Sequence, residues 1–401
     1  MNMLWVHEVS YSEKPVYEYQ DFAERLVSRG HNVEVIDFNE SVSSTNERYS
    51  VSRTGSGEVT LCTIPHSNIP VLKYIEARER YKQMLRSRLE EGKIDVAFVY
   101  SVFINGSSTV KLCHKFGIPV VYRVLDAYHR LRPGKMIQEI LRYGERYVYR
   151  NADSILVTNE KMINYVSEIA NRDVSNKVVV VNHGVDIEHF VNQQFDIQLA
   201  EKYQIKSDDI VALFLGTTYT FSGLYGLLKQ MPQILKVIPS FKLMIVGSGE
   251  LDDELAILVQ NSNLSENVVM TGMIPYTELP KHLSLAKIAI NPFQINPITQ
   301  DIIPIKILQY QAAGLPVLST PLPDLVIKHP EKTSGVIYSI SDSTEDFIIK
   351  MVELLLQPSI LYEKGVKGQQ FVKTNYSIGI AVDNIEKICS TQQIASTSDS
   401  K

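Results

Sequence analysis

The sequence predicts an α/β protein with two domains, each built on a parallel sheet between helices. The chain has 401 residues, too many for one ordinary core and suited to two domains of roughly 150–200 residues each. Short apolar runs rich in branched residues alternate with helical segments along most of the chain. Most runs end in glycine, proline or polar residues, as buried parallel strands do.

The composition is that of an ordinary soluble globular protein. Hydrophobic residues make up 44% and charged residues 21% of the chain. A net charge of -5 and a pI near 6.0 argue against a general nucleic-acid binder. Cys62, Cys113 and Cys389 are few and widely spaced, so neither a disulfide framework nor a zinc site is predicted.

The N-terminus MNMLWVHEVS lacks the basic region and long apolar core of a signal peptide. No window approaches the length of apolar sequence that a transmembrane helix needs. A cytoplasmic protein is therefore expected.

The first half alternates strands and helices in βα order, each strand being an apolar run bounded by turn residues. The predicted strands are residues 3–9, 32–37, 61–64, 94–100, 118–124, 153–158 and 178–181, and the predicted helices are 15–29, 70–91, 106–116, 135–150 and 160–170. Residues 40–60 are polar and serine-rich and predict an exposed loop with room for a short hairpin.

The second half repeats this alternation. Its predicted strands are residues 210–215, 241–246, 267–274, 287–290 and 335–338, and its later helices are 276–286, 304–313, 343–356, 359–374 and 377–389. The final STQQIASTSDSK is polar and is expected to fray.

The β-loop-α-β unit at residues 288–320 is the most informative stretch. Pro304 fits the first turn of a helix, and Gly314 with Pro316 marks its end. Lys306 then falls near the positive end of the helix dipole, which disfavours a cation unless an anion joins it. A bound phosphate would remove that conflict, with Asp301 and Gln309 lining the same site.

Asp301, Gln309 and the segment Ala312-Ala-Gly-Leu-Pro-Val317 resemble the signature of retaining GT-B glycosyltransferases of the family-4-like group. In that signature two glutamates are separated by seven residues and precede AxGxPV. The resemblance implies that Asp301 contacts the donor sugar and that Gln309 binds the nucleotide ribose, through an amide that lacks charge assistance.

Residues 181–190, VNHGVDIEHF, resemble the family's NGVD…F turn, which leads from the first domain into the second. The resemblance implies two Rossmann-like domains facing across a cleft. Residues 1–190 would form the acceptor-side domain and 191–375 the nucleotide-sugar-binding domain. Residues 376–401 would form a C-terminal helix crossing back to the first domain, followed by a frayed tail.

The loop after the first strand of the second domain commonly holds an arginine and a lysine in this family, and Thr217 and Ser222 stand nearest to their places. Backbone N–H groups and hydroxyls of this loop would hold phosphate, leaving Lys306 as the cation. The predicted donor-binding residues are Gly216, Thr217, Thr218, Ser222, Gly223, Gly247, Met273, Ile274, Ile305 and Gln309. A tight βα turn without a ligand is the alternative.

Family members commonly have a His-Asp pair where this chain reads Leu125-Asp126. Asp126 and His129 are therefore the candidate substitutes, and they join Asp301 and Lys306 as predicted catalytic residues. Asp126 acting only as a backbone cap is the alternative.

The helix predicted at residues 135–150 is basic, and Arg142, Arg146 and Arg150 recur every four residues along it. Such a face suits anionic lipid headgroups or a pyrophosphate-bearing acceptor. An ordinary solvated face is the other interpretation.

The resemblance predicts a retaining glycosyltransferase that moves a sugar from a nucleotide-diphosphate donor to an acceptor hydroxyl, on a lipid-linked or surface glycan. The nucleotide sugar is the co-substrate, and no metal, other cofactor or nucleic acid is expected. Peripheral contact with the inner face of the membrane is expected through the helix at 135–150. A non-catalytic sugar-nucleotide-binding subunit and a nucleotide-sugar epimerase remain as alternatives.

Overall fold

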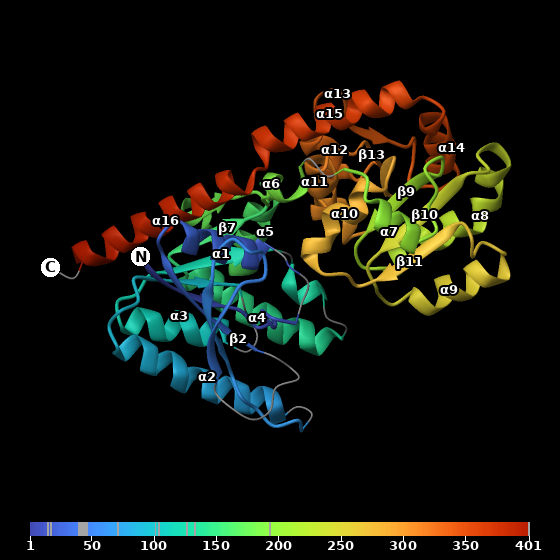
Figure 1. The fold of residues 1–401 in the computed structure, drawn as a ribbon. Helices are drawn as coiled ribbons and strands as arrows, with labels where there is room; N and C mark the ends of the chain where they lie inside the picture. Colours follow the sequence, from blue (N-terminus) through green and yellow to red (C-terminus); the bar gives the residue numbers. More distant parts are fainter. Residues whose placement is uncertain are drawn as a thin grey trace. The chain divides into compact units, whose positions relative to one another are not determined.

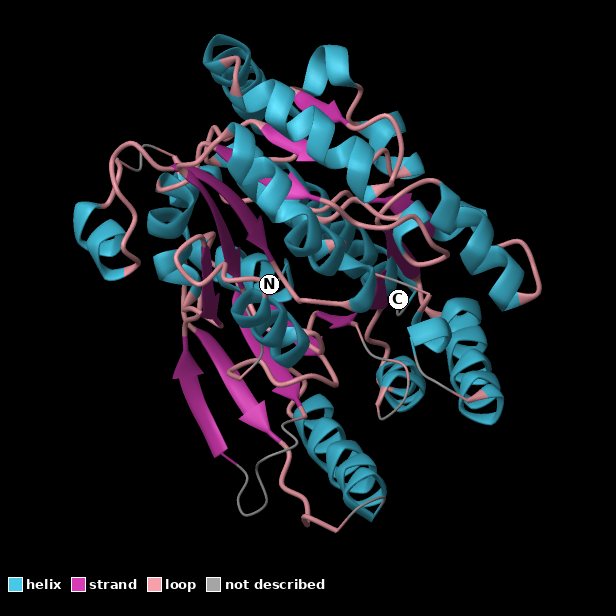
Figure 2. Cartoon of the chain, turned by 90° about the vertical axis from the view of Figure 1, so that its right-hand side faces the viewer, coloured by secondary structure: helices cyan, strands magenta, loops and turns pink. Residues whose placement is uncertain are grey.

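The computed structural model describes residues 1–13, 16, 18–38, 47–69, 72–100, 102, 105–125, 127–131, 134–191 and 194–399. The chain forms two compact units, unit 1 (residues 1–183 with 379–401) and unit 2 (residues 184–378). Each unit has its own sheet, with helices packed against the strands (Figure 1, Figure 2). The predicted fold class of two Rossmann-like α/β domains is confirmed.

Unit 1 is built on a sheet with the strand order β3-β4-β2-β1-β5-β6-β7-β8. The strands are β1 (Asn2–Val6), β2 (Asn32–Asp37), β3 (Glu47–Val51), β4 (Val59–Thr63), β5 (Val96–Val99), β6 (Val120–Val124), β7 (Ser154–Val157) and β8 (Val178–Val180). All pairs are parallel except β3 with β4. The central strands β1, β5 and β6 are mostly apolar and buried because helices cover both faces of a parallel sheet.

The helices of unit 1 follow the strands in βα order. They are α1 (Glu18–Ser28), α2 (Leu72–Glu90), α3 (Gly106–Lys115), η1 (Tyr128–Leu131), α4 (Lys135–Asn151), α5 (Lys161–Ala170) and η2 (Ser175–Lys177). Within the polar segment that was predicted to have room for a short hairpin, residues 47–51 form β3, an edge strand that pairs antiparallel with β4.

The last helix, α16 (Ile378–Asp399), returns to unit 1, as the predicted fold requires (Figure 1). Arg29 at the end of α1 bonds Asp383 and Glu386 at 2.6 and 2.9 Å. The helix was expected to end near residue 389 but continues to Asp399, because no glycine or proline interrupts it after Gly379.

Unit 2 has a parallel sheet with the order β11-β10-β9-β12-β13-β14. Its strands are β9 (Ile210–Leu215), β10 (Phe241–Val246), β11 (Val268–Gly272), β12 (Ile288–Asn291), β13 (Val317–Ser319) and β14 (Val336–Tyr338). Strand order reverses between β9 and β12, which makes this pair the topological switch point of the sheet.

Unit 2 is covered by helices that include both long and single-turn segments. These are α6 (Ile187–Phe190), α7 (Ile197–Lys202), η3 (Thr220–Ser222), α8 (Leu224–Val237), α9 (Asp252–Asn261), η4 (Tyr276–Glu278), α10 (Leu279–Ser284), η5 (Thr299–Asp301), α11 (Ile305–Ala312), α12 (Pro323–Lys328), α13 (Glu331–Ser334), α14 (Thr344–Leu355) and α15 (Pro358–Asn375). The predicted helix at 304–313 corresponds to α11, with Pro304 immediately before it and Gly314 just after it.

Candidate active site

The switch point of unit 2 brings together two loops that leave the sheet in opposite directions. Residues 216–223 follow β9 and residues 292–301 follow β12. The main-chain N–H of Gln294 donates to the carbonyl of Phe221 at 2.9 Å, which joins the two loops. Ligands of open α/β sheets bind at such an edge, so the candidate donor site is built here.

Lys306, the second residue of α11, is the buried cation of this site and is 9% exposed. Its Nζ lies 3.8 Å from the ring centroids of both Phe214 and Phe293. Nζ has no hydrogen-bond partner among the described residues. The aromatic faces attract a cation but replace only part of its hydration, so the hydrogen-bonding capacity of the amine is unused.

Burial lowers the pKa of Lys306 well below its ordinary range, because no anion in the described part of the chain compensates for the lost water. An anion beside Nζ would favour the charged form again. The first turn of α11 adds free N–H groups and the positive end of the helix dipole. These features together favour a phosphate beside Lys306.

Glycines allow the main chains of neighbouring loops to approach closely around Lys306. A Cβ on Gly216, which has φ 123°, would lie 3.7 Å from the Nζ of Lys306. A Cβ on Gly247, which has φ 128°, would lie 2.2 Å from the carbonyl oxygen of Gly216. Side chains are therefore excluded where the loops after β9 and β10 meet.

The hydroxyls of Thr218 and Ser222 are hydrogen-bonded within unit 2. Both residues are fully buried. The Thr218 hydroxyl donates to the Asp252 carboxylate at 2.5 Å, and the Ser222 hydroxyl accepts from the N–H of Leu224 at 3.4 Å. The fold uses these hydroxyls itself, whereas Thr217 is exposed.

The other predicted donor residues are spread over four segments of unit 2. Gly223 immediately precedes α8, Gly247 follows β10, Met273 and Ile274 follow β11, and Ile305 and Gln309 lie on α11. Met273 is exposed, and Ile274, Ile305 and Gln309 are partly exposed. Asp301 ends η5 and is also partly exposed. The described geometry brings Lys306, Gly216 and Gly247 together.

Tyr310 fixes α11 to the switch point, and sequence reasoning missed it. Its hydroxyl accepts the main-chain N–H of Leu215 at 2.6 Å and donates to the carbonyl of Ile290 at 3.4 Å. A buried tyrosine four residues after Lys306 was a usable signal, because buried tyrosine hydroxyls need a partner. These two hydrogen bonds fix the position of α11, and with it Lys306, relative to β9 and β12.

In unit 1, His129 is held by a second residue that the sequence reasoning did not single out. His129 Nδ1 lies 2.7 Å from the buried carboxylate of Glu145 and 3.1 Å from the hydroxyl of Tyr165. Burial raises the pKa of the Glu145 carboxyl, and the neighbouring His129 opposes that shift. His129 Nε2 makes no hydrogen bond to the described part of the chain. Asp126, the other predicted catalytic residue of this segment, lies outside the described residues.

Glu18, Arg123 and His183 form an ionic cluster in unit 1, in which Glu18 and Arg123 are buried and His183 is partly exposed. Arg123 donates two hydrogen bonds to Glu18, at 2.7 and 2.9 Å, and His183 lies 2.6 Å from the same carboxylate. Burial would raise the pKa of Glu18, but Arg123 and then His183 outweigh it and lower the pKa to about 2. Arg123 therefore holds the fold together and is not part of a solvent-facing basic surface.

The basic residues of α4 divide into two groups. Arg146 and Arg150 donate to the carbonyls of Ile169 and Ala170 at the end of α5, at 3.1 and 2.6 Å. Arg142 remains near the surface, 3.7 Å from Glu139. Four apolar residues on the first half of the helix are exposed: Met136 by 76%, Ile137 by 46%, Ile140 by 54% and Tyr143 by 72%.

Within the described ranges, no helix is both long and apolar enough to cross a membrane. In the same part of the chain, no group of three or more histidine, cysteine, aspartate or glutamate residues is arranged to hold a metal ion.

Two family models match the chain, one in each unit. Residues 19–189 match Glycosyltransferase Family 4, and residues 209–357 match Glycosyl transferases group 1. The second match contains the Gly216 loop, Gly247 and Lys306.

Relatives of known sequence are also glycosyltransferases. A GDP-mannose-dependent alpha-(1-6)-phosphatidylinositol monomannoside mannosyltransferase of Mycolicibacterium smegmatis is 27% identical over 48% of this chain and 51% of its own length. The alpha-monoglucosyldiacylglycerol synthase of Streptococcus pneumoniae is 22% identical over 68% of this chain and 62% of its own length. The chain thus spans about half to three fifths of the length of these relatives.

Solved structures share the fold along nearly the whole chain. Sucrose-phosphate synthase from Thermosynechococcus elongatus aligns with a TM-score of 0.78 and 15% identity, covering 98% of this chain and 100% of that structure. Anabaena HepE in complex with UDP and glucose aligns with a TM-score of 0.73 and 13% identity, covering 97% and 99%. With both units matched by family models and the whole fold shared, this chain belongs to the GT-B glycosyltransferases of the family-4-like group.

Proposed function

We propose that this protein transfers a sugar from a nucleotide-diphosphate donor to an acceptor hydroxyl, with retention of configuration. The observation that carries the proposal is Lys306, a buried amine without a polar partner among the described residues, at the switch point of unit 2. A diphosphate supplies the anion that this position lacks.

The main task of the site is to stabilise the departing diphosphate. Charge develops on the phosphate oxygens as the glycosidic bond breaks, and a cation already in place stabilises it without reorganisation. Lys306, the N–H groups of the first turn of α11 and the main chain at Gly216 supply this environment. The arginine and lysine that the family commonly has in the loop after β9 are replaced here. Lys306 must therefore supply more of the positive charge that stabilises the diphosphate.

Asp301 orients the donor sugar and Gln309 binds the ribose in this proposal, as the family resemblance implies. The side-chain amide of Gln309 makes no hydrogen bond to the described residues, so it is available to bind the ribose. Retention without a dedicated nucleophile requires the leaving phosphate to take the acceptor proton on the same face. His129, positioned through Nδ1 by Glu145, has Nε2 free for a substrate hydroxyl.

The proposed acceptor is lipid-linked or a surface glycan. The mycobacterial and pneumococcal relatives are named for phosphatidylinositol mannoside and diacylglycerol substrates. Met136, Ile137, Ile140 and Tyr143 offer an exposed apolar stripe on α4, next to Lys135 and Arg142. Such a stripe suits peripheral contact with an anionic membrane, through apolar side chains more than through Arg146 and Arg150.

Thermal shift against UDP-, GDP-, ADP- and dTDP-sugars tests the donor site. A ligand at 100 times its dissociation constant adds about 2.7 kcal/mol to stability. One nucleotide should stabilise the wild type and not Lys306→Ala, which should also lose transfer while keeping its fold. Equal turnover by the variant would remove phosphate binding by Lys306 from the mechanism.

The family matches favour transfer over the alternative functions, and product analysis separates them. Transfer requires an acceptor, and NMR of the product would show the donor's anomeric configuration retained. An epimerase would convert the donor without any acceptor. A non-catalytic subunit would show the thermal shift without product.

A further inference from the structure

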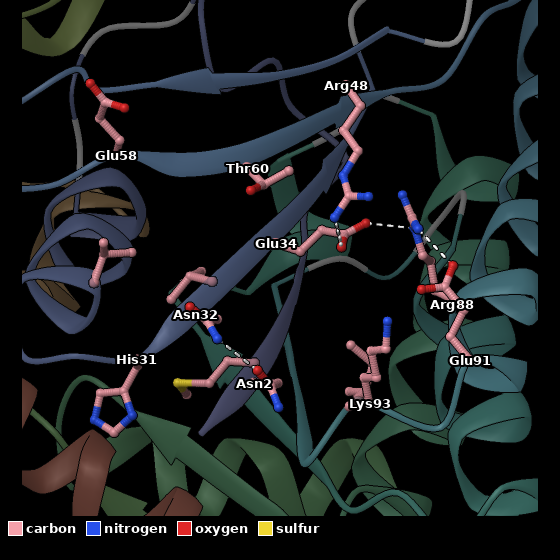
Figure 3. Close-up of a pocket in the computed structure, with 14 residues that line it drawn as sticks. Asn2, His31, Asn32, Glu34, Arg48, Glu58, Thr60, Arg88, Glu91 and Lys93 are labelled. Atoms are coloured by element: carbon pink, nitrogen blue, oxygen red, sulfur yellow. Dashed lines mark hydrogen bonds and ion pairs between the residues drawn. The ribbon is translucent and has the colours of Figure 1, made fainter.

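Unit 1 has two adjoining hollows on the side of the sheet edge formed by β3 and β4. The larger, of about 600 Å³, is lined by residues of β3, β4 and α2. The smaller, of about 380 Å³, is shown in Figure 3. Arg48 of β3 and Arg88 of α2 line both hollows, and both pair with Glu34, at 3.2 and 2.8 Å. This ion-paired trio is the wall that the two hollows share.

The larger hollow is rich in unused hydrogen-bond donors. Arg80, Gln83 and Ser87 lie along one side of α2, and their side chains make no hydrogen bond or close ion pair to any described residue. Arg48 and Arg88 add two more guanidinium groups, which are paired with Glu34 and, for Arg88, also with Glu91, while no carboxylate is itself among the described residues that line this hollow. Three guanidinium groups around one hollow favour a carboxylate or phosphate group.

The smaller hollow has a mixed lining of a different kind. Asn2, Asn32, Thr60 and Lys93 offer amide, hydroxyl and ammonium groups, and Glu58 offers acceptors. Glu91 is ion-paired with Arg88 at 2.7 Å, and Asn32 donates to Asn2 at 2.9 Å. Several of these residues precede or begin a strand: Asn2 begins β1, Asn32 begins β2, and Lys93 precedes β5. Hydroxyl groups of a sugar both donate and accept, so a lining that does both suits a polyol better than a bare anion.

The position of the hollows separates them from the proposed reaction. The smaller hollow lies at the amino ends of β1, β2 and β5, whereas substrates of open α/β sheets bind beyond the carboxyl ends. The volumes of both hollows fall within the range of ordinary small-ligand sites. The chain as a whole has a net charge of -5, so a local cluster of arginines differs from the rest of the chain.

We propose that these two hollows form a binding site for an anionic saccharide, separate from the donor site. Its carboxylate or phosphate group lies among Arg48, Arg80 and Arg88, and neighbouring sugar hydroxyls bond Asn2, Asn32 and Thr60. The site holds an acidic sugar chain away from the reacting end, so binding there does not depend on the donor nucleotide.

Titration calorimetry of the full chain with trigalacturonate tests this proposal, with maltotriose and inorganic phosphate as comparison ligands. Arg80→Gln removes one free guanidinium without breaking an ion pair. Arg86→Gln, on the same helix and bonded to Glu90 outside both hollows, is the matched control. We expect trigalacturonate to bind about tenfold more weakly to Arg80→Gln and unchanged to Arg86→Gln.

Three results would overturn the proposal. Equal weakening by both variants would indicate diffuse attraction to a basic helix. Maltotriose binding as tightly as trigalacturonate would exclude recognition of the charge. Phosphate binding as tightly as trigalacturonate would reduce the site to one for a bare anion. A nucleotide-induced thermal shift that is the same in Arg80→Gln and the wild type would show that the donor site is intact in the test.

Discussion

Lys306 occupies a position where packing alone would favour a hydrocarbon side chain. Its amine lies between two phenyl rings with no polar partner among the described residues. Lys306→Met should therefore raise the free energy of unfolding of the ligand-free protein by about 1–3 kcal/mol, because the buried polar group is removed at nearly constant volume. Urea denaturation measures this, with the exposed Lys287→Met as control.

The same substitution should change how stability depends on pH. The pKa of Lys306 is lower in the folded than in the unfolded chain, so the unfolded chain binds more protons between the two values. Stability of the wild type should then rise with pH in that window, by about 1.4 kcal/mol per pH unit for one proton, relative to Lys306→Met. Parallel curves for the two proteins would mean that folded Lys306 is charged.

Single residues also show which features could not be predicted from the sequence. The position of Lys306 in the first turn of a helix is predictable, since Pro304 and Gly314 mark that helix in the sequence. Its burial between Phe214 and Phe293 is not predictable, because those residues are brought there by separate strands. Glu145 reads as one more charge on a basic helix, and only the fold places it against His129.

At the scale of elements, glycines set how closely the loops of the donor site pack. Gly247→Ala would place a Cβ 2.2 Å from the Gly216 carbonyl oxygen, at a φ of 128°. Gly272→Ala also has a positive φ, of 67°, but its Cβ meets nothing within 4 Å. We expect a loss of about 3 kcal/mol or more for Gly247→Ala and about 1 kcal/mol for Gly272→Ala, measured by urea denaturation.

The two glycine variants should also differ in nucleotide binding. Gly247→Ala moves the main chain of Gly216 away from Lys306, so the nucleotide thermal shift should be lost. Gly272→Ala should retain it. Loss in both variants would show that general destabilisation, and not the loop contact, abolishes binding.

The exposed stripe of α4 gives a prediction for membrane contact. Ile137→Ser/Ile140→Ser removes two exposed apolar side chains and should weaken sedimentation with phosphatidylglycerol vesicles by about tenfold or more. Ile257→Ser on α9 removes an equally exposed side chain elsewhere and should have no effect. Unchanged binding by the double variant would exclude α4 as the contact.

The elements best predicted from sequence are the central strands and α11, because apolar runs with terminal glycine or proline specify them locally. β3 was predicted only as part of an exposed loop with room for a short hairpin, because its residues are polar, and its antiparallel pairing with β4 forms such a hairpin. From sequence, Tyr310 is predicted only as a core residue of α11. The structure adds that its hydroxyl accepts the main-chain N–H of Leu215.

For the whole molecule, the course of the chain predicts which part folds alone. Unit 2 is one continuous segment with its own core, whereas unit 1 needs α16 from the far end of the chain. A fragment of residues 184–378 should unfold cooperatively on heating, followed by circular dichroism. Residues 1–183 should not, because Val382, Ile385 and Cys389 of α16 are then missing from unit 1.

The matched comparison is a chain of residues 1–183 joined by a flexible linker to residues 379–399, which restores α16. This chain should regain a cooperative transition. A cooperative transition in residues 1–183 alone would contradict the dependence on α16. The two-domain fold class was predictable from chain length and βα alternation, but the contribution of α16 to unit 1 came only from the family resemblance.

The low basicity of Lys306 also makes it a distinctive chemical target. A lysine with a lowered pKa has a larger unprotonated, nucleophilic fraction at a given pH than an ordinary surface lysine. Pyridoxal 5′-phosphate combines an aldehyde with the phosphate that this site favours. Reduction with borohydride would then fix the label on Lys306 ahead of other lysines, and a bound nucleotide sugar would protect it.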